Sequence, residues 1–458
     1  MLDTPNEDLP AHRPEPTSKA RHEPLLWLLL AAIVAMIVWT NLAFAPPAPE
    51  GADSAGPGDD LAFVFQGKYL VGAKTLFDSL GDAFAGQTEA LTAGLGDLAA
   101  EPDRRLALVP VYAQLGEVDT ARSTLEELRA SDLEPPLSQD VETFAGLLDE
   151  PPRTPEGKVR RDFLERFGWF AELALARSGD GGAKGEILAA AQRLTLGVFL
   201  VFGLGLAAVL VGAVLLIFAA IGHAQGRLGS AYEAVAGKQR GHRVAYLESL
   251  ILFLVALPAV GVLGIAFDGM WGLLLNWLVL PVALWPLVRG ETLEDLRDAL
   301  GLRSGDGVLR EVGAGLVAYV AAMPILAVGL VATAVAATFV EQPPYHPIVD
   351  WVRDSGGAEV FLIYMLAALW APLMEEAIFR GAFYHYLRGK ARVFVSALTV
   401  SVVFAAIHPQ GLVGIPFLTS LAVALALARE WRGSVIASVV MHMVHNGLAV
   451  TFMLSILR

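Results

Sequence analysis

Long apolar runs separated by short polar connections dominate this chain. About nine runs have the length or apolarity of membrane-spanning helices, since a helix needs about 20 apolar residues to cross the hydrocarbon core. They are predicted at residues 25–45, 194–221, 245–267, 271–288, 312–340, 359–379, 393–407, 417–428 and 434–457. The pattern predicts an all-α, polytopic membrane protein of about nine transmembrane helices.

One long stretch, residues 46–190, lacks such a run. Between Leu61 and Ala176 its apolar residues recur at helical spacing between Gly and Pro signals, which predicts a soluble helical domain. Val111 to Leu128 resembles half of a tetratricopeptide repeat, in which small residues let two helices pack closely. An ordinary helical hairpin fits the pattern equally well. Either form offers residues 61–176 as a surface for a protein partner or substrate.

The predicted first span has a distinctive setting. Residues 1–24 are rich in Pro, Glu and Arg and lack periodicity, which predicts a disordered tail. Residues 25–45 are predicted to be an uncleaved anchor because Ala43-Phe44-Ala45 is followed by two prolines; a signal peptide is the alternative. Residues 191–357 then form further transmembrane helices, and residues 358–458 form the last membrane core.

Charge orients these spans. Lys and Arg gather in the tail and in alternate connections, so the positive-inside rule places these in the cytoplasm and residues 46–190 on the opposite side. Most of the net charge of −14 also lies in residues 46–190, which argues against binding of nucleic acid or an anionic membrane surface. The lipid bilayer is the expected surrounding. The absence of cysteine excludes thiolate metal sites and cysteine nucleophiles.

Charged and polar residues interrupt three of the last apolar runs. Glu375 and Glu376 lie within one run, and Arg380 follows Glu376 at the i,i+4 spacing that allows neutralisation along a helix face. Intramembrane acids are costly and usually mark functional sites. His408 ends the next run, and the last run carries His442 and Asn446, four residues apart. We expect the chain between Pro409 and Pro416 to be a connection tucked into the membrane beside this cluster.

Together these residues resemble a known family, the CAAX protease and bacteriocin-processing (CPBP) intramembrane endopeptidases, which include the type II CAAX prenyl proteases. Three motifs carry the resemblance, in family order and each on its own predicted helix: Glu375-Glu376-x-x-x-Arg380, Phe404-x-x-x-His408 and His442-x-x-x-Asn446. They lie in about the last hundred residues. The resemblance implies a catalytic membrane core at residues 358–458 and favours a bacterial-type inner or plasma membrane.

The resemblance also implies roles for these residues. Glu375 and His408 would activate a water molecule for attack on a peptide carbonyl, and His442 and Asn446 would donate hydrogen bonds to the oxyanion. Glu376, Arg380 and Phe404 would support them. A zinc ion held by Glu375, His408 and His442 is the alternative to this metal-free mechanism.

The resulting hypothesis is an intramembrane endopeptidase that hydrolyses a membrane-associated or lipid-modified peptide or protein. Two other classes stay open. A non-catalytic membrane adaptor would use residues 61–176 to bind partners, and a proton-coupled transporter would use the acids and histidines as a relay. The identity of the substrate, prenylated or not, is open.

Overall fold

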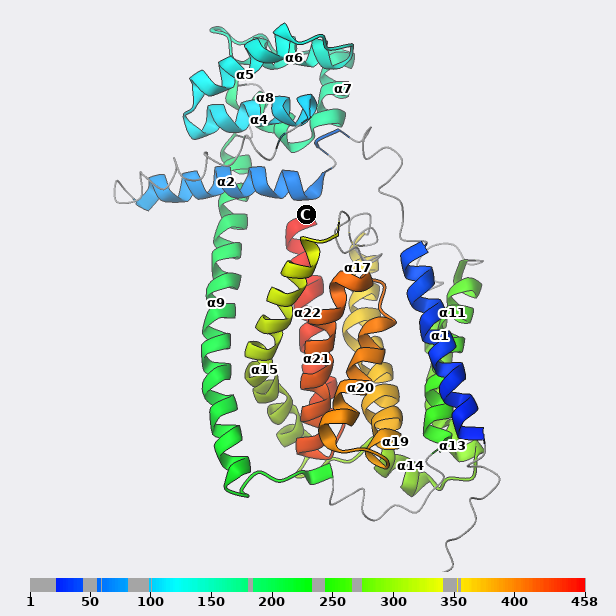
Figure 1. The fold of residues 1–458 in the computed structure, drawn as a ribbon. Coiled ribbons are helices and arrows are strands. Elements are labelled where there is room, and N and C mark those ends of the chain that lie inside the picture. Colours follow the sequence, from blue (N-terminus) through cyan, green and yellow to red (C-terminus); the bar gives the residue numbers. More distant parts are fainter. Residues whose placement is uncertain are drawn as a thin grey trace, which may run out of the picture. The chain divides into compact units, whose positions relative to one another are not determined.

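The computed structural model describes residues 22–43, 56–58, 60–80, 99, 101–179, 184–232, 244–265, 274–340, 352 and 356–457. All regular elements within these ranges are helices, as Figure 1 shows, which confirms the predicted all-α class. Residues 1–21 of the predicted tail, residues 44 and 45 of the predicted anchor and residues 46–55 after it lie outside the described ranges.

Seven described helices are long and apolar enough to cross a membrane, so this is a polytopic integral membrane protein. They cover Glu23–Asn41, Lys184–Ala224, Val244–Gly264, Val308–Ala337, Gly357–Arg388, Gly411–Arg432 and Ile436–Ser455. Two further predicted spans form shorter apolar helices, Leu275–Val288 and Val393–Ala406. The first of these is a 3-10 helix, η4 (Leu275–Leu284), followed by one turn of α-helix, α13 (Trp285–Val288).

The chain separates into two compact units, with the boundary inside helix α9. One unit, here called the membrane unit, contains residues 1–45 and 208–451; the other, the helical unit, contains residues 46–207 and the last few residues. In the membrane unit α21 (Gly411–Arg432) packs against both α20 (Val393–Ala406) and α15 (Val308–Ala337). The same unit contains α1 (Glu23–Ala43), α11 (Val244–Ile265) and, up to Thr451, α22 (Ile436–Leu457).

The prediction of a non-helical connection from Pro409 to Pro416 is wrong. Helix α21 already begins at Gly411, so Pro416 lies inside it. A proline inside a helix disturbs the backbone ladder, and a polar partner from a neighbouring helix can compensate for this in a membrane. Here the backbone N–H of Phe417 donates to the Thr333 hydroxyl on α15 at 3.2 Å. That partner allows the helix to pass through the proline.

Helix α9 (Lys184–Ala224) has 41 residues and starts well before the predicted apolar run. At 1.5 Å per residue it is about 61 Å long, roughly twice the hydrocarbon thickness. In the helical unit, α2 (Leu61–Leu80) contacts the first part of α9 at Gly72. A Cβ atom on Gly72 would lie 2.1 Å from the carbonyl oxygen of Ala191. The Thr195 hydroxyl donates to the Tyr69 carbonyl at 3.0 Å beside this contact. Glycine is required here because the two backbones touch.

The helical unit continues with five short helices, α4 (Pro102–Leu115), α5 (Val118–Ala130), α6 (Leu137–Leu147), α7 (Gly157–Phe167) and α8 (Trp169–Arg177). Gly116, with φ of 95°, ends α4, and only Glu117 separates it from α5. Left-handed backbone of this kind favours glycine at a helix end. These two helices cover the stretch that resembles a tetratricopeptide repeat; membership of that repeat class stays a prediction.

Two bidentate ion pairs in the helical unit have the same chemistry and different burial. Arg166 donates to both oxygens of Asp140 at 2.8 and 2.6 Å, and the Asp140 side chain is only 3% exposed. Arg129 donates to both oxygens of Glu142 at 2.7 and 2.8 Å, where 59% of the Glu142 side chain is exposed. Hydrogen bonding from Arg129 lowers the pKa of Glu142 below its ordinary value.

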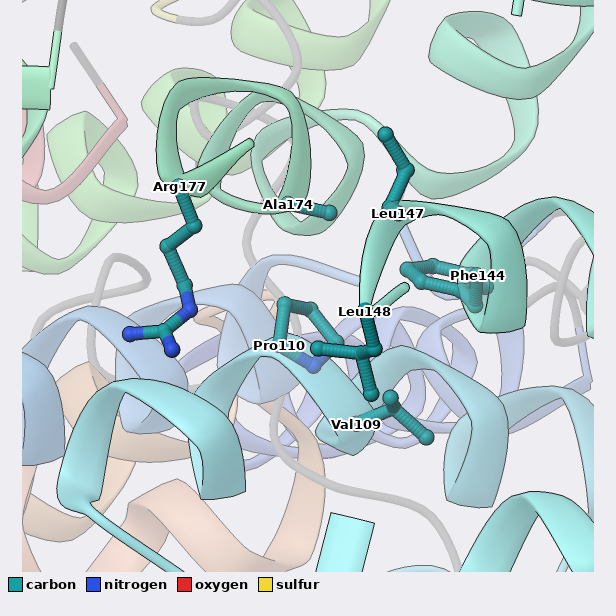
Figure 2. Close-up of a pocket in the computed structure, with 7 residues that line it drawn as sticks. All are labelled: Val109, Pro110, Phe144, Leu147, Leu148, Ala174 and Arg177. Carbon is teal, nitrogen blue, oxygen red and sulfur yellow. The ribbon is translucent and has the colours of Figure 1, made fainter. Parts of the chain in front are cut away.

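A small cavity lies among helices α4, α6 and α8 of this unit. Figure 2 shows its lining side chains: Val109, Pro110, Phe144, Leu147, Leu148, Ala174 and Arg177. Its volume of about 10 Å³ holds about one water molecule. The Arg177 guanidinium at this cavity donates to the side-chain oxygen of Gln114 at 2.9 Å. The cavity is therefore the size of a packing defect and is too small to hold an organic ligand.

Candidate active site

Both glutamates lie on one continuous helical segment, Gly357–Arg388, with two unusual turns. Its parts are α17 (Gly357–Tyr364), the π-helical η5 (Met365–Trp370), α18 (Ala371–Glu376), the π-helical η6 (Ala377–Phe383) and α19 (Tyr384–Arg388). Pro372 is the second residue of α18, where its missing N–H and its ring disfavour a regular α-helical turn before it. π-helical turns are rare and often occur at functional sites. Glu375 and Glu376 are the last two residues of α18, the short α-helical piece between the two π-helical turns.

Glu376 belongs to a buried ion pair. Its Oε1 lies 2.8 Å from Nη1 of Arg380, and neither side chain is exposed. Arg380 also donates from Nη2 to the Ala422 carbonyl at 3.2 Å, and its guanidinium lies 4.5 Å from the ring centre of Phe404. A buried charge is tolerated when it is paired and hydrogen-bonded. Arg380 thus provides the positive charge that allows Glu376 to stay ionised in this apolar setting.

His442 lies between the two carboxylates. Its Nδ1 is 3.0 Å from Oε1 of Glu376, and its Nε2 is 3.8 Å from Oε2 of Glu375. An ionised carboxylate only accepts hydrogen bonds, so Nδ1 of His442 must carry a proton. In the neutral ring Nε2 is then the basic nitrogen, and it faces Glu375. This arrangement, with one carboxylate orienting the ring and another at its basic nitrogen, is suited to proton transfer.

Phe404 links His408 to this cluster. Its ring centre lies 4.3 Å from that of His408, 6.0 Å from that of His442 and 5.1 Å from that of Phe379. Nδ1 of His408 lies 2.6 Å from the Phe404 carbonyl oxygen, an acceptor, so this nitrogen also carries the proton. Both histidines therefore have Nε2 as the basic nitrogen when neutral.

Asn446 lies further along the last helix and contacts the glutamate helix from there. Its side-chain nitrogen donates to the Ala367 carbonyl in η5 at 2.8 Å. Carbonyl groups in a π-helical turn are spaced differently from those of an α-helix, and a side-chain donor can stabilise the altered turn. The structure thus groups Glu375, Glu376, Arg380 and His442 directly, joins His408 through Phe404, and engages the Asn446 amide with backbone.

The polar residues of this site fall inside one matched segment. Residues 357–448 match the family model described as type II CAAX prenyl endopeptidase Rce1-like. We call residues 357–448 the Rce1-like segment, after the family model to which they are similar. The match confirms the resemblance inferred from the three motifs, and the family that the segment resembles is one of proteases. Neither a curated protein nor a solved structure matches the chain.

The zinc alternative, with Glu375, His408 and His442 as ligands, stays a prediction. Among the residues that the structure describes, no group of three or more His, Asp or Glu side chains converges on a point where a metal could bind. Nδ1 of His442 contacts Glu376 and Nδ1 of His408 contacts a backbone carbonyl, which leaves Nε2 of each ring as its possible ligand atom. No step below involves a metal.

One supporting residue of the Rce1-like segment escapes the sequence motifs. Arg429, on α21, is fully buried and donates to the carbonyls of Arg380 at 3.3 Å, Ala299 at 3.2 Å and Gly433. Through its contacts with Arg380 and Ala299, Arg429 joins α21 to η6 and to the end of α14 (Leu293–Leu300). In the sequence Arg429 counts as one of the basic residues at a cytoplasmic helix end. Its position inside the apolar stretch before Trp431 is the signal that could have revealed it.

Two histidines outside the three motifs have aromatic partners. Nδ1 of His385 lies 2.8 Å from the Tyr232 hydroxyl, and Nδ1 of His445 lies 3.3 Å from the Tyr319 hydroxyl. Neither contact involves Glu375 or Glu376. These two histidines hold helices together away from the carboxylate cluster.

Proposed function

We propose that the protein is an intramembrane endopeptidase that hydrolyses a peptide bond in a membrane-associated or lipid-modified peptide. The observation that carries the proposal is the placement of His442 between Glu375 and an Arg380-paired Glu376, inside the Rce1-like segment. A structural charge cluster would need only the Glu376–Arg380 pair. Such a cluster would not need Glu375, the second carboxylate, at the basic nitrogen of His442. In a protease Glu375 supplies the general base.

In this mechanism Glu375 removes a proton from water while the water oxygen attacks the scissile carbonyl carbon. A general base of this kind typically contributes 10²–10⁴-fold. Its 19% exposed side chain makes Glu375 the accessible carboxylate of the pair, whereas Glu376 is fully buried. The basic Nε2 of His408 accepts a hydrogen bond from the same water and helps to orient it.

His442 carries the proton onward. Its Nε2 accepts the proton from Glu375, and the resulting imidazolium is stabilised by the two carboxylates on either side. The protonated ring donates a hydrogen bond to the oxyanion of the tetrahedral intermediate, a contribution worth about 3–4 kcal/mol in water-excluded sites. When the carbon–nitrogen bond breaks, the proton passes to the leaving amine. Asn446, through Ala367, holds the π-helical turn before the base.

Comparative peptide profiling tests this function and finds the substrate in one experiment. Membranes carrying wild-type protein are compared with membranes carrying Glu375→Gln and with a control, Glu294→Gln, whose glutamate is exposed on α14. We expect a set of cleaved peptides in the wild-type and Glu294→Gln samples that Glu375→Gln lacks. Farnesylated CAAX peptides and bacteriocin-type peptides are added as candidate substrates.

Equal peptide patterns from wild type and well-folded Glu375→Gln would refute the proposal. A His408→Ala variant separates it from the adaptor hypothesis, because an adaptor would keep its function after this substitution and lose it after deletion of residues 61–176. The proteolytic mechanism requires His408 in the site itself.

A further inference from the structure

Helix α1 lies outside the Rce1-like segment but packs into the same core. Leu30 and Ile33 are 2% and 7% exposed, and both belong to the buried apolar cluster that contains Met374, Phe379 and Phe404. A helix that serves only as an anchor needs no buried side chains, since lipid is as apolar as a protein core. These contacts suggest a second role for α1.

One end of α1 is fastened to the helix that carries the glutamates. The indole N–H of Trp27 donates to the Tyr386 hydroxyl at 2.8 Å, and the Trp27 ring lies 6.1 Å from that of Phe383. Glu23 accepts a hydrogen bond from the Tyr386 hydroxyl and pairs with Lys390. These hydrogen bonds and this ion pair fix the start of α1 against η6 and α19.

The other end of α1 reaches the turn that carries His408. The side-chain nitrogen of Asn41 donates to the His408 carbonyl at 3.1 Å. His408 follows the end of α20, where carbonyls lack the N–H groups of a next turn and need other donors. Asn41 supplies such a donor from a residue 367 positions away.

On α1, the distance between the contacts at its two ends is close to the length of α20. From Trp27 to Asn41 α1 rises about 21 Å, and from Val393 to Ala406 α20 rises about 20 Å at the same 1.5 Å per residue. The contacts at both ends therefore fix the position and rotation of α1 beside α20. A helix held only by apolar packing could slide or rotate without losing hydrogen bonds.

We propose that α1 is an integral part of the catalytic core and that Asn41 is a positioning residue for His408. This inference rests on the proposed proteolytic function for its consequence on catalysis. Asn41 fixes the His408 backbone, and the Phe404 carbonyl fixes the ring through Nδ1. With both fixed, Nε2 of His408 is held for contact with the water molecule that Glu375 activates. The N-terminal span thereby completes a site whose other residues all lie beyond residue 356.

Three full-length variants in lipid nanodiscs test this proposal. Asn41→Leu keeps the side-chain size and removes the donor; Asn41→Gln keeps an amide donor; and Thr40→Ala is the matched control, because the Thr40 hydroxyl only donates to Ile37 in its own helix. The first readout is the rate at which diethyl pyrocarbonate modifies His408, together with amide hydrogen exchange at residues 405–411, both by mass spectrometry. We expect at least threefold faster reaction in Asn41→Leu, with Thr40→Ala unchanged and Asn41→Gln closer to wild type.

The second readout is release of the peptides that distinguish wild-type from Glu375→Gln membranes. We expect Asn41→Leu to release them about tenfold or more slowly, since small misplacements of a reacting group can cost up to about 10² in rate. Partial rescue in Asn41→Gln would separate positioning from general loss of packing. Unchanged His408 modification and exchange in Asn41→Leu would overturn the inference, as would normal hydrolysis by this variant. If Glu375→Gln keeps wild-type hydrolysis, the proposed function fails, while the labelling readout still tests the link between α1 and His408.

Discussion

Replacing Arg380 with Met tests the charge balance beneath the proposed base. Met is apolar and of similar length, so Arg380→Met fills most of the same space while removing the positive charge. Glu376 then keeps its buried carboxylate and its contact with His442 but loses its cation. We expect this single substitution to destabilise the membrane unit strongly.

The size of the effect follows from the contacts. At 2.8 Å and an effective dielectric constant of about 20, the attraction between Glu376 and Arg380 is about 6 kcal/mol, part of which offsets the cost of burying both charges. Breaking a buried pair on one side costs about 3–5 kcal/mol. Loss of the cation–π contact with Phe404 adds up to about 2 kcal/mol. The expected total is about 5 kcal/mol.

The assay is an unfolding titration in mixed detergent followed by tryptophan fluorescence, on wild type, Arg380→Met, Glu376→Gln and the double variant. We expect the double variant to recover at least about 2 kcal/mol relative to Arg380→Met, because no unpaired charge remains. Arg310→Met, at an exposed position, is the control. The reasoning is refuted if Arg380→Met changes stability by no more than the ~0.5 kcal/mol typical of surface substitutions, or if the double variant recovers nothing.

Two matched pairs of substitutions test other contacts. In the helical unit Arg166→Met, which strands a buried carboxylate, should cost about 3 kcal/mol in protection of local amides from hydrogen exchange, whereas Arg129→Met at the exposed pair should cost less than about 1 kcal/mol; equal costs would contradict this. In the membrane unit Gly381→Ala would place a Cβ atom 2.9 Å from a side-chain carbon of Leu300 and should cost about 1–3 kcal/mol, while Gly313→Ala, with open space at its Cβ, should be neutral or stabilising. Tryptophan-monitored unfolding of both glycine variants gives the comparison, and a neutral Gly381→Ala would show that α14 can move away from η6.

The apolar pattern predicts most of the fold because bilayer thickness sets the length of a spanning helix. It places seven full-length spans and both shorter apolar helices, but it misses the early starts of α9 and α21 and the late end of the segment Gly357–Arg388. It misses the helical path through Pro416 because the hydroxyl that accepts from the Phe417 N–H, that of Thr333, comes from a helix some eighty residues earlier in the chain. Local rules for proline contain no information about such a partner.

For the site, spacing along one helix predicts local pairs well. The contact between Glu376 and Arg380 follows directly from the i,i+4 rule. Contacts between helices are not predicted in this way, because they depend on the rotation and depth of each helix. Three examples are the placement of His442 between both carboxylates, the hydrogen bond from Asn446 to Ala367 and the hydrogen bond from Asn41 to His408. A single sequence fixes neither of these.

The two π-helical turns around α18 bear on how this sequence can change in length. In an α-helix each residue turns the chain by about 100°, and a π-helical turn holds an extra residue. Straightening Met365–Trp370 into ordinary α-helix without removing a residue would rotate Glu375 about 100° away from His442 relative to the preceding helix, whereas deleting one residue would remove the π-helical turn and keep the direction of Glu375. We therefore expect related sequences with ordinary α-helix here to be one residue shorter across this segment. A one-residue alignment gap here would identify chains that keep the arrangement of the glutamates without this turn.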